Sequence, residues 1–274
     1  MNRPPSSLSD PGRQPNYRRV LEVLACPACG GALVERREPV RIHACWRRAP
    51  GEDRHQQSRL ASFVSVAAGG GPVLDLGSGA RRLSNHVVAV DICPLPGLDL
   101  VADGHRLPFR SGTVGRIVCT GVLEHVEEPT QVVAEMARVL RPAGRVYIAV
   151  PFMQGFHPGG GTQQDFQRYT HVGLLRLLSP FRITEWGISG GPSATLAWIL
   201  REYLALAFGW NRVLYRMAYA IAGPLTSWLH HLDVFLDRFP QANRIACGFY
   251  VIGEKVGGPL SRKSPVDADP RETP

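Results

Sequence analysis

A short apolar run that ends in a glycine turn is the feature that most constrains how this chain can fold. Residues 73–79 read Val-Leu-Asp-Leu-Gly-Ser-Gly. Because glycine has no Cβ, a Gly-x-Gly turn lets the backbone pass close to a ligand at the end of a buried strand. A tight strand-to-helix turn that binds nothing gives the same local pattern. The turn therefore needs support from the segments that follow it.

Several further short apolar runs follow and indicate a parallel sheet. They are rich in β-branched residues and hardly alternate with polar ones, which is typical of strands buried on both faces. Between the later runs, apolar residues recur at helical spacing until Pro142 and Gly144, and a second helix is expected after a glycine-rich loop. We predict strands over 73–76, 87–90, 116–119, 145–150, 181–187 and 244–256, and helices over 129–140 and 171–178.

Two of the apolar segments end in an acidic residue. Asp91 follows Val-Ala-Val at 88–90, and Asp103 follows the short run 101–102. The carboxyl ends of parallel strands meet at one edge of the sheet, where a carboxylate can accept hydrogen bonds from ribose hydroxyls. A nucleoside-containing ligand at this edge is therefore expected.

These segments, taken in order, resemble the small-molecule branch of the class I, Rossmann-like methyltransferases, which use S-adenosylmethionine. The resemblance implies an α/β sandwich with a mostly parallel sheet, an antiparallel last strand and a helical insertion before that strand. Residues 61–256 would form this domain, with the insertion over 194–240, between a disordered lead (1–16), a small cysteine-containing segment (17–60) and a disordered tail (257–274). Five blocks carry the resemblance: 73–79, 88–92, 103–109, 122–126 and 135–144.

The same resemblance assigns roles at the cofactor. It implies that the methionine part is bordered by Asp75, Gly77, Ser78 and Gly79, and that the segment from Thr120 to Val122 passes beneath the sulfonium. Asp91 would hold the ribose. The adenine edge would contact Asp103 and the Gly104 amide, and the adenine ring would lie between Ile92 and Leu107.

The chain departs from the family pattern at the glycine turn. Arg81 stands where a third glycine is common, and only 14 positions separate Gly77 from Asp91, whereas such acids commonly lie about 20 residues on. The helix after the turn should therefore be short or irregular. Ala143 also replaces the more usual middle glycine of a Pro-Gly-Gly turn. A nicotinamide dehydrogenase is disfavoured, because it would need the full Gly-x-Gly-x-x-Gly.

Candidates for a proton-accepting residue follow the fourth and fifth strands. Methyl transfer is an in-line displacement, and an oxygen acceptor benefits from a base that takes its proton as the bond forms. His125, His157 and Asp165 are the candidates. The alternatives are a structural imidazole at His125, an Arg168–Asp165 ion pair, and a Thr170 that only caps the following helix.

The cysteine pair Cys26 and Cys29 resembles the first half of a zinc ribbon. Tetrahedral zinc needs two more ligands, and only His43 and Cys45 are available nearby because no second Cys-x-x-Cys exists. We favour a metal-free remnant of such a ribbon. Zinc through these four residues is the alternative.

The strongly apolar stretch 194–239 needs something to cover it. Arginines and Gly223-Pro224 interrupt it, so no span of about 20 apolar residues exists. A lid over the acceptor pocket is the preferred interpretation, and an oligomer interface or an in-plane membrane contact are the alternatives. No apolar secretion signal is visible at the N-terminus, so the expected location is cytoplasmic, with peripheral membrane contact under the last alternative.

Charge composition does not indicate a nucleic-acid partner. The formal net charge is +8, but the sequence contains neither a five-residue basic run nor a basic stripe interleaved with aromatics. The sequence therefore predicts methyl transfer from S-adenosylmethionine to an oxygen atom of a small molecule or saccharide. The rival prediction is a non-catalytic partner subunit that keeps the fold for binding.

Overall fold

The computed structural model describes residues 54–65, 71–79, 81–157 and 164–256. The predicted lead, the tail and the candidate zinc ligands Cys26, Cys29, His43 and Cys45 lie outside these residues.

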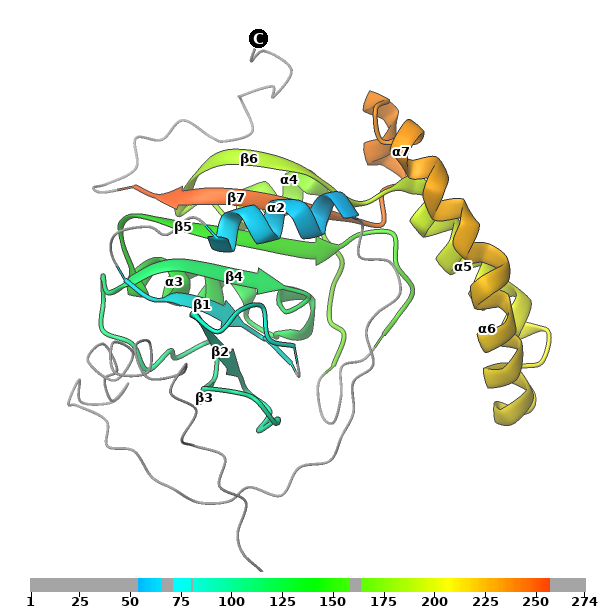
Figure 1. Ribbon diagram of the computed structural model, residues 1–274, viewed down its shortest axis with the longest axis horizontal. Coiled ribbons are helices and arrows are strands. Elements are labelled where there is room, and N and C mark those ends of the chain that lie inside the picture. The colour runs from blue at the N-terminus through cyan, green and yellow to red at the C-terminus, as the bar shows by residue number, and fades with distance from the viewer. Residues whose placement is uncertain (1–53, 66–70, 80, 158–163, 257–274) are drawn as a thin grey trace, which may run out of the picture.

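A seven-stranded mixed sheet forms the centre of the molecule (Figure 1). The strand order is β3-β2-β1-β4-β5-β7-β6, and β7 runs antiparallel to both of its neighbours. The mostly parallel sheet and the antiparallel last strand are therefore confirmed. The strands are β1 (Val73–Leu76), β2 (Val87–Asp91), β3 (Leu100–Val101), β4 (Val114–Thr120), β5 (Leu140–Pro151), β6 (Phe181–Gly190) and β7 (Gly248–Lys255).

Helices cover both faces of this sheet. Figure 1 shows α2 (Arg54–Ser65) on one face and α3 (Pro129–Val139) with α4 (His171–Leu177) on the other. Successive strand residues point to opposite faces, so neighbours such as Ile117 and Val118 belong to different core clusters. This two-sided burial explains why the strands were recognisable as continuous apolar runs.

The strand boundaries differ from the sequence prediction most at β7 and β5. The last strand begins at Gly248 rather than at residue 244, because Pro240–Arg244 forms a 3₁₀ helix, η3. β5 begins at Leu140, directly after α3, and passes through Ala143 at a φ of 59°. The left-handed conformation at Ala143 accounts for the glycine that is more usual there.

The chain folds back immediately after the glycine turn. The N–H groups of Gly77 and Ser78 both donate to the carbonyl of Val90, at 2.8 and 3.1 Å. Within residues 81–86 no helix forms, which confirms the prediction of a short or irregular segment. The shortened connection leaves too few residues for both a helix and the return to β2.

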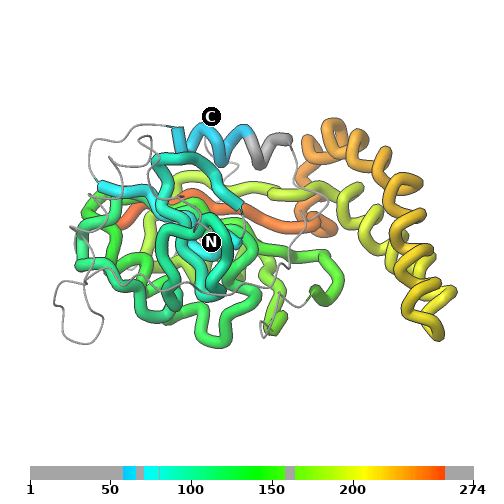
Figure 2. The backbone as a smooth tube through the Cα atoms, turned by 60° about the horizontal axis from the view of Figure 1, so that its bottom comes forward, coloured from blue at the N-terminus to red at the C-terminus, as the bar shows by residue number. Residues whose placement is uncertain are grey.

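A helical hairpin occupies the insertion before β7. It consists of α5 (Pro192–Leu206), α6 (Arg212–Ser227), the 3₁₀ helix η2 (Trp228–Leu232) and α7 (Asp233–Leu236). The predicted lid is wrong, because the hairpin projects from the end of the sheet instead of lying over its edge (Figures 1 and 2). Gly223-Pro224 does not break the stretch either, since α6 continues through Pro224.

Thr170 caps α4, as one of the sequence alternatives predicted. Its hydroxyl oxygen accepts a hydrogen bond from the Gly173 N–H at 3.1 Å. Replacing Thr170 by alanine should lower the free energy of unfolding by about 1 kcal/mol, because the first turn loses this acceptor. Urea denaturation measures the change. Thr130→Ala, an exposed position in the first turn of α3, is the matched control and should shift stability by less than about 0.5 kcal/mol.

Candidate functional site

The glycine turn and the end of β2 are joined by the Asp91 side chain. Gly79 N–H donates to Asp91 Oδ2 at 2.8 Å, and Cys93 N–H donates to Oδ1 at 2.9 Å. Gly77 and Gly79 have φ values of 72° and 57°, and a Cβ on Gly77 would lie 2.1 Å from Val122. The turn therefore requires glycine, and the Asp91 carboxylate is held in one orientation with lone pairs remaining on each oxygen.

Arg81 bridges the ends of β1 and β4. Its Nη2 donates to Thr120 Oγ1 at 2.7 Å and lies 3.4 Å from Asp75 Oδ1. The Asp75 side chain is buried, whereas that of Arg81 is part-exposed. The residue that replaces the family's third glycine thus compensates a buried carboxylate, which is a physical role that a glycine cannot fill.

The proposed adenine region contains one exposed apolar side chain and one accessible carboxylate. Ile92 is 53% exposed, and the Asp103 side chain is 49% exposed. Partial burial raises the pKa of Asp103, but hydrogen bonds from the backbone and ring of His105 outweigh it and hold the pKa below its ordinary value. Leu107 is only 1% exposed, and its N–H donates to Glu135 Oε2 at 3.0 Å. Ile92 therefore offers a planar ring a larger exposed apolar surface than Leu107 does.

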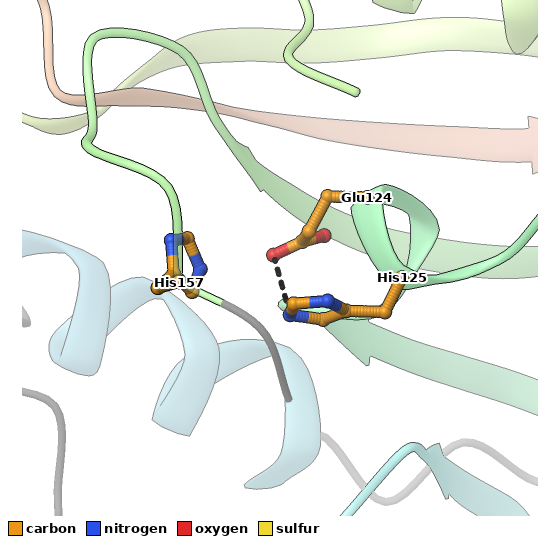
Figure 3. Close-up of side chains that lie close together, drawn as sticks. All are labelled: Glu124, His125 and His157. Carbon is orange, nitrogen blue, oxygen red and sulfur yellow. Dashed lines mark ion pairs between the residues drawn. The ribbon is translucent and has the colours of Figure 1, made fainter. Parts of the chain in front are cut away.

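Three titratable side chains meet beyond the ends of β4 and β5. Figure 3 shows Glu124 and His125 from the 3₁₀ helix η1 (Leu123–His125) facing His157 from the loop after β5. His125 Nε2 lies 3.9 Å from Glu124 Oε1, and the two imidazole rings meet edge to face at 5.4 Å between centroids. The structure thus brings together two of the three predicted base candidates and adds Glu124.

The third candidate, Asp165, is buried against Arg168 and the His157 backbone. Arg168 forms an ion pair with Asp165, and His157 N–H donates to Asp165 Oδ2 at 2.8 Å. Burial alone would raise the pKa of Asp165, but these hydrogen bonds and charges lower it to about 2. A carboxylate so strongly stabilised is a poor proton acceptor, so its geometry suits positioning of the His157 loop.

Hydrogen bonds to the backbone orient both imidazoles. His125 Nδ1 lies 2.8 Å from the Gln164 carbonyl, and His157 Nδ1 lies 3.0 Å from the Gly155 carbonyl. A carbonyl can only accept, so the Gln164 contact assigns a proton to Nδ1 of His125 and leaves the lone pair on its Nε2 when the ring is neutral. In this tautomer His125 presents its acceptor nitrogen toward Glu124. At His157 the Gly155 carbonyl and the donating Arg168 guanidinium both approach Nδ1, so these contacts assign no tautomer there.

Burial shifts the protonation of this cluster. It raises the pKa of Glu124 to about 7, against the opposing effects of a backbone hydrogen bond and Arg168. It lowers the pKa of His125, although the Gln164 carbonyl acts in the other direction. At neutral pH the His125 ring is therefore mostly uncharged, which is the form that can accept a proton.

The same three residues could offer ligands to a metal ion. Their nearest ligand atoms lie within 4.8 Å of one another. Donors on one tetrahedral zinc ion would lie about 3.4 Å apart, given bonds of about 2.1 Å. The Arg168 guanidinium also stands 3.1 Å from His157 Nδ1. The spacing and this nearby cation fit proton transfer better than metal binding.

Two residues at the site carried no role in the sequence analysis. Glu124 lies inside one of the family blocks, and its position directly before His125 was the available signal. Trp198 of α5 had no local signal, because it reaches the site only through the tertiary structure: its ring lies 6.2 Å from that of His157. A Cβ on Gly155 would lie 2.7 Å from Trp198 Nε1, so glycine is needed at that contact.

Part of the chain is similar to known proteins. Residues 65–148 match a family model described as a methyltransferase domain. A 37.1 kDa protein of a Streptomyces fradiae transposon is 34% identical over 98 residues, which cover 30% of this chain and 28% of that protein. A methyltransferase of Mycobacterium avium is 29% identical over 156 residues, covering 49% of this chain and 59% of that protein. The chain spans 28% of the length of the first of these curated relatives.

Solved structures with a related arrangement include the [4+2]-cyclase SpnF and a phosphoethanolamine N-methyltransferase of Haemonchus contortus bound to S-adenosyl-L-methionine. The first is 17% identical with a TM-score of 0.46, covering 80% of this chain and 89% of that chain. The second is 10% identical with a TM-score of 0.47, covering 76% of this chain and 54% of that chain.

The sheet order and the family match together describe this part of the chain. Residues 65–148, which match the methyltransferase-domain model, include the glycine turn and the acidic ends of β2 and β3. They lie in a mostly parallel sheet with an antiparallel β7, which is a Rossmann-like arrangement. The chain therefore contains a segment similar to a methyltransferase domain, set in a Rossmann-like fold.

The buried Glu124 should make stability depend on pH. Its folded pKa of about 7 lies above its ordinary value of 4.5, so its contribution is fully present below pH 4.5 and is lost as pH rises through 7. As the pH rises from 4.5 to 7, the free energy of unfolding of Glu124→Gln should therefore increase relative to that of the original protein, by on the order of 3 kcal/mol. Urea denaturation at a series of pH values measures the difference. A difference that stays flat across this range would contradict the assignment, and Glu127→Gln, at an exposed neighbour, is the control.

Proposed function

We propose that this protein transfers a methyl group from S-adenosylmethionine to an oxygen atom of a small molecule or saccharide. One observation carries the proposal: a glycine turn with the accessible Asp103 and Ile92 lies at the same sheet edge as the oriented His125–His157 pair. This combination provides a nucleoside-binding edge beside a proton acceptor.

The residues at the glycine turn suit the cofactor. Asp91 would hold the ribose, Asp103 and the Gly104 amide would hold the adenine edge, and Ile92 would contact the ring. Arg81 would lie near the methionine part, where its guanidinium suits a carboxylate. When bound, the cofactor supplies the electrophilic methyl group.

The imidazole pair suits an acceptor hydroxyl. His125 Nε2 would take the proton of the hydroxyl, while its Nδ1–H remains bonded to the Gln164 carbonyl. Asp165 and Arg168 would keep His157 beside it, because they bind the backbone of that loop. Neutral imidazole is the form that the lowered His125 pKa favours. An oxygen acceptor needs such a base more than a sulfur or an uncharged amine does.

The rival function is a non-catalytic subunit with the same fold. A cofactor edge filled by side chains would favour it. Ile92 and Asp103 are instead about half exposed, so this edge supports an enzyme. The metal-free cysteine segment and the cytoplasmic location stay predictions. Among the described residues, no helix is long and apolar enough to cross a membrane.

Cofactor binding tests the first part of the proposal. Asp91→Ala and Asp103→Ala should each weaken binding of S-adenosylhomocysteine by roughly tenfold or more, because each removes a charge-assisted hydrogen-bond acceptor. Isothermal titration calorimetry measures the affinity, with Glu127→Gln as the control. If the original protein does not bind at millimolar ligand, the proposal fails.

The proton acceptor is tested by kinetics. A screen of hydroxylated small molecules and saccharides, followed by release of S-adenosylhomocysteine, identifies an acceptor. With that acceptor, His125→Gln should lower kcat by about 10²-fold or more and abolish the acidic limb of the pH profile, while cofactor affinity stays unchanged. His86→Gln, at an exposed histidine near α2, is the control. A His125→Gln enzyme with its original kcat and pH profile would exclude this role.

A further inference from the structure

A continuous apolar stripe runs along the outer side of the helical hairpin. Exposed large apolar residues recur every three or four positions from α6 into α7, which places them on one side of the helix. They are Leu214, Met217, Ile221, Leu225, Trp228, Leu232 and Phe235. Single exposed apolar residues are ordinary on a protein surface, but a stripe of this length indicates a binding surface.

Helix α5 carries a second stripe of the same kind. Leu196, Ile199, Tyr203 and Leu206 are exposed at helical spacing, and Trp210 in the turn after α5 is 78% exposed. The opposite side of α5, which includes Ala197 and Ala205, is buried. Both helices thus leave apolar surface that the described part of the chain does not cover.

The hairpin does not need these stripes for its own packing. Asp233 accepts hydrogen bonds from the N–H groups of Ser193 and Ala194, which fixes the start of α5 against the start of α7. Tyr215 of α6 donates to Glu202 of α5, and the Arg201 guanidinium lies over the Tyr219 ring, 5.3 Å from its centroid, as a cation–π pair. The two helices are therefore held together by their inner sides.

The charges of the hairpin are distributed unequally. Arg212, Arg216 and Arg238 are exposed. The acidic side chains of the same segment are engaged or shielded: Glu202 bonds Tyr215, Asp233 is buried, and Asp237 is part-buried. Exposed arginines next to an apolar stripe with tryptophans are the composition of a helix that lies in the interface of an anionic bilayer.

Helix length favours an in-plane orientation. α6 has 16 residues, so it extends over about 24 Å, and a span of the hydrocarbon core needs about 30 Å. Arg212 and Arg216 also lie on the side of α6 away from the stripe, which suits a helix with one side in the acyl boundary and the other toward headgroups. A second copy of the chain would need no such excess of basic over acidic exposed groups.

We propose that the hairpin of residues 192–239 docks this protein on the surface of anionic membranes, with the stripe that runs from α6 into α7 inserted into the acyl boundary. Trp198 connects this surface to the site, because it lies on α5 and packs near His157. Docking would therefore place the acceptor site beside the bilayer, where an acceptor with an apolar tail is held. This last consequence rests on the proposed methyl transfer, whereas docking does not.

Sedimentation with lipid vesicles tests the proposal on the full chain. The protein should bind vesicles of equal parts phosphatidylcholine and phosphatidylglycerol, more weakly at high salt, and hardly bind pure phosphatidylcholine. Ile221→Glu with Leu225→Glu should weaken binding by roughly tenfold or more, because both side chains lie in the stripe. Ser227→Glu with Gln241→Glu adds the same charge at exposed polar positions and should weaken it much less.

Two outcomes would overturn the proposal. One is the absence of binding to the anionic vesicles by the original protein. The other is a concentration-dependent dimer that Ile221→Glu with Leu225→Glu abolishes, seen by sedimentation velocity without vesicle binding, because a second copy would then cover the stripe. Circular dichroism of the variants checks that each remains folded. Vesicle sedimentation measures binding and not methyl transfer. A failure of docking is therefore distinguishable from a failure of the proposed methyl transfer.

Discussion

The hydrogen bonds that hold the glycine turn on β2 are the constraint on which the site depends. The Val90 carbonyl accepts from two successive N–H groups of the turn, and Asp91 accepts from a third at Gly79. The end of β1 is thereby tied to the end of β2 without an intervening helix. The Arg81 guanidinium extends this arrangement to β4 through Thr120. Together these contacts fix the sheet edge at which we propose that the cofactor binds.

A second set of contacts brings the His125–His157 pair to the same edge. Phe166 N–H donates to the Glu124 carbonyl at 2.8 Å, and the Tyr169 hydroxyl donates to the Leu123 carbonyl at 2.9 Å. The segment after β5 is thus fastened to η1, which follows β4. Because His125 and His157 belong to these two segments, their meeting is a result of this fastening. The Arg168–Asp165 pair then holds the His157 loop.

The domain and its hairpin meet different physical demands. In the sheet, apolar side chains are covered from both faces, so the strands contribute to one core. In the hairpin, only the inner sides of α5 and α6 are covered, and the outer sides stay apolar. Trp198 is the side chain through which the two parts approach each other at the site.

The sequence by itself determined the sheet and the glycine turn at its edge. Doubly buried strands give continuous β-branched runs, and a turn that excludes Cβ leaves glycines at 77 and 79, so both features are local. The Arg168–Asp165 ion pair joins residues three positions apart and was one of the sequence alternatives. The tertiary structure alone decided that Glu124 is buried beside His125, that Trp198 approaches His157, and that the hairpin projects outward instead of forming a lid. Burial, long-range contact and helix direction depend on segments far apart in the chain, and no local pattern records them.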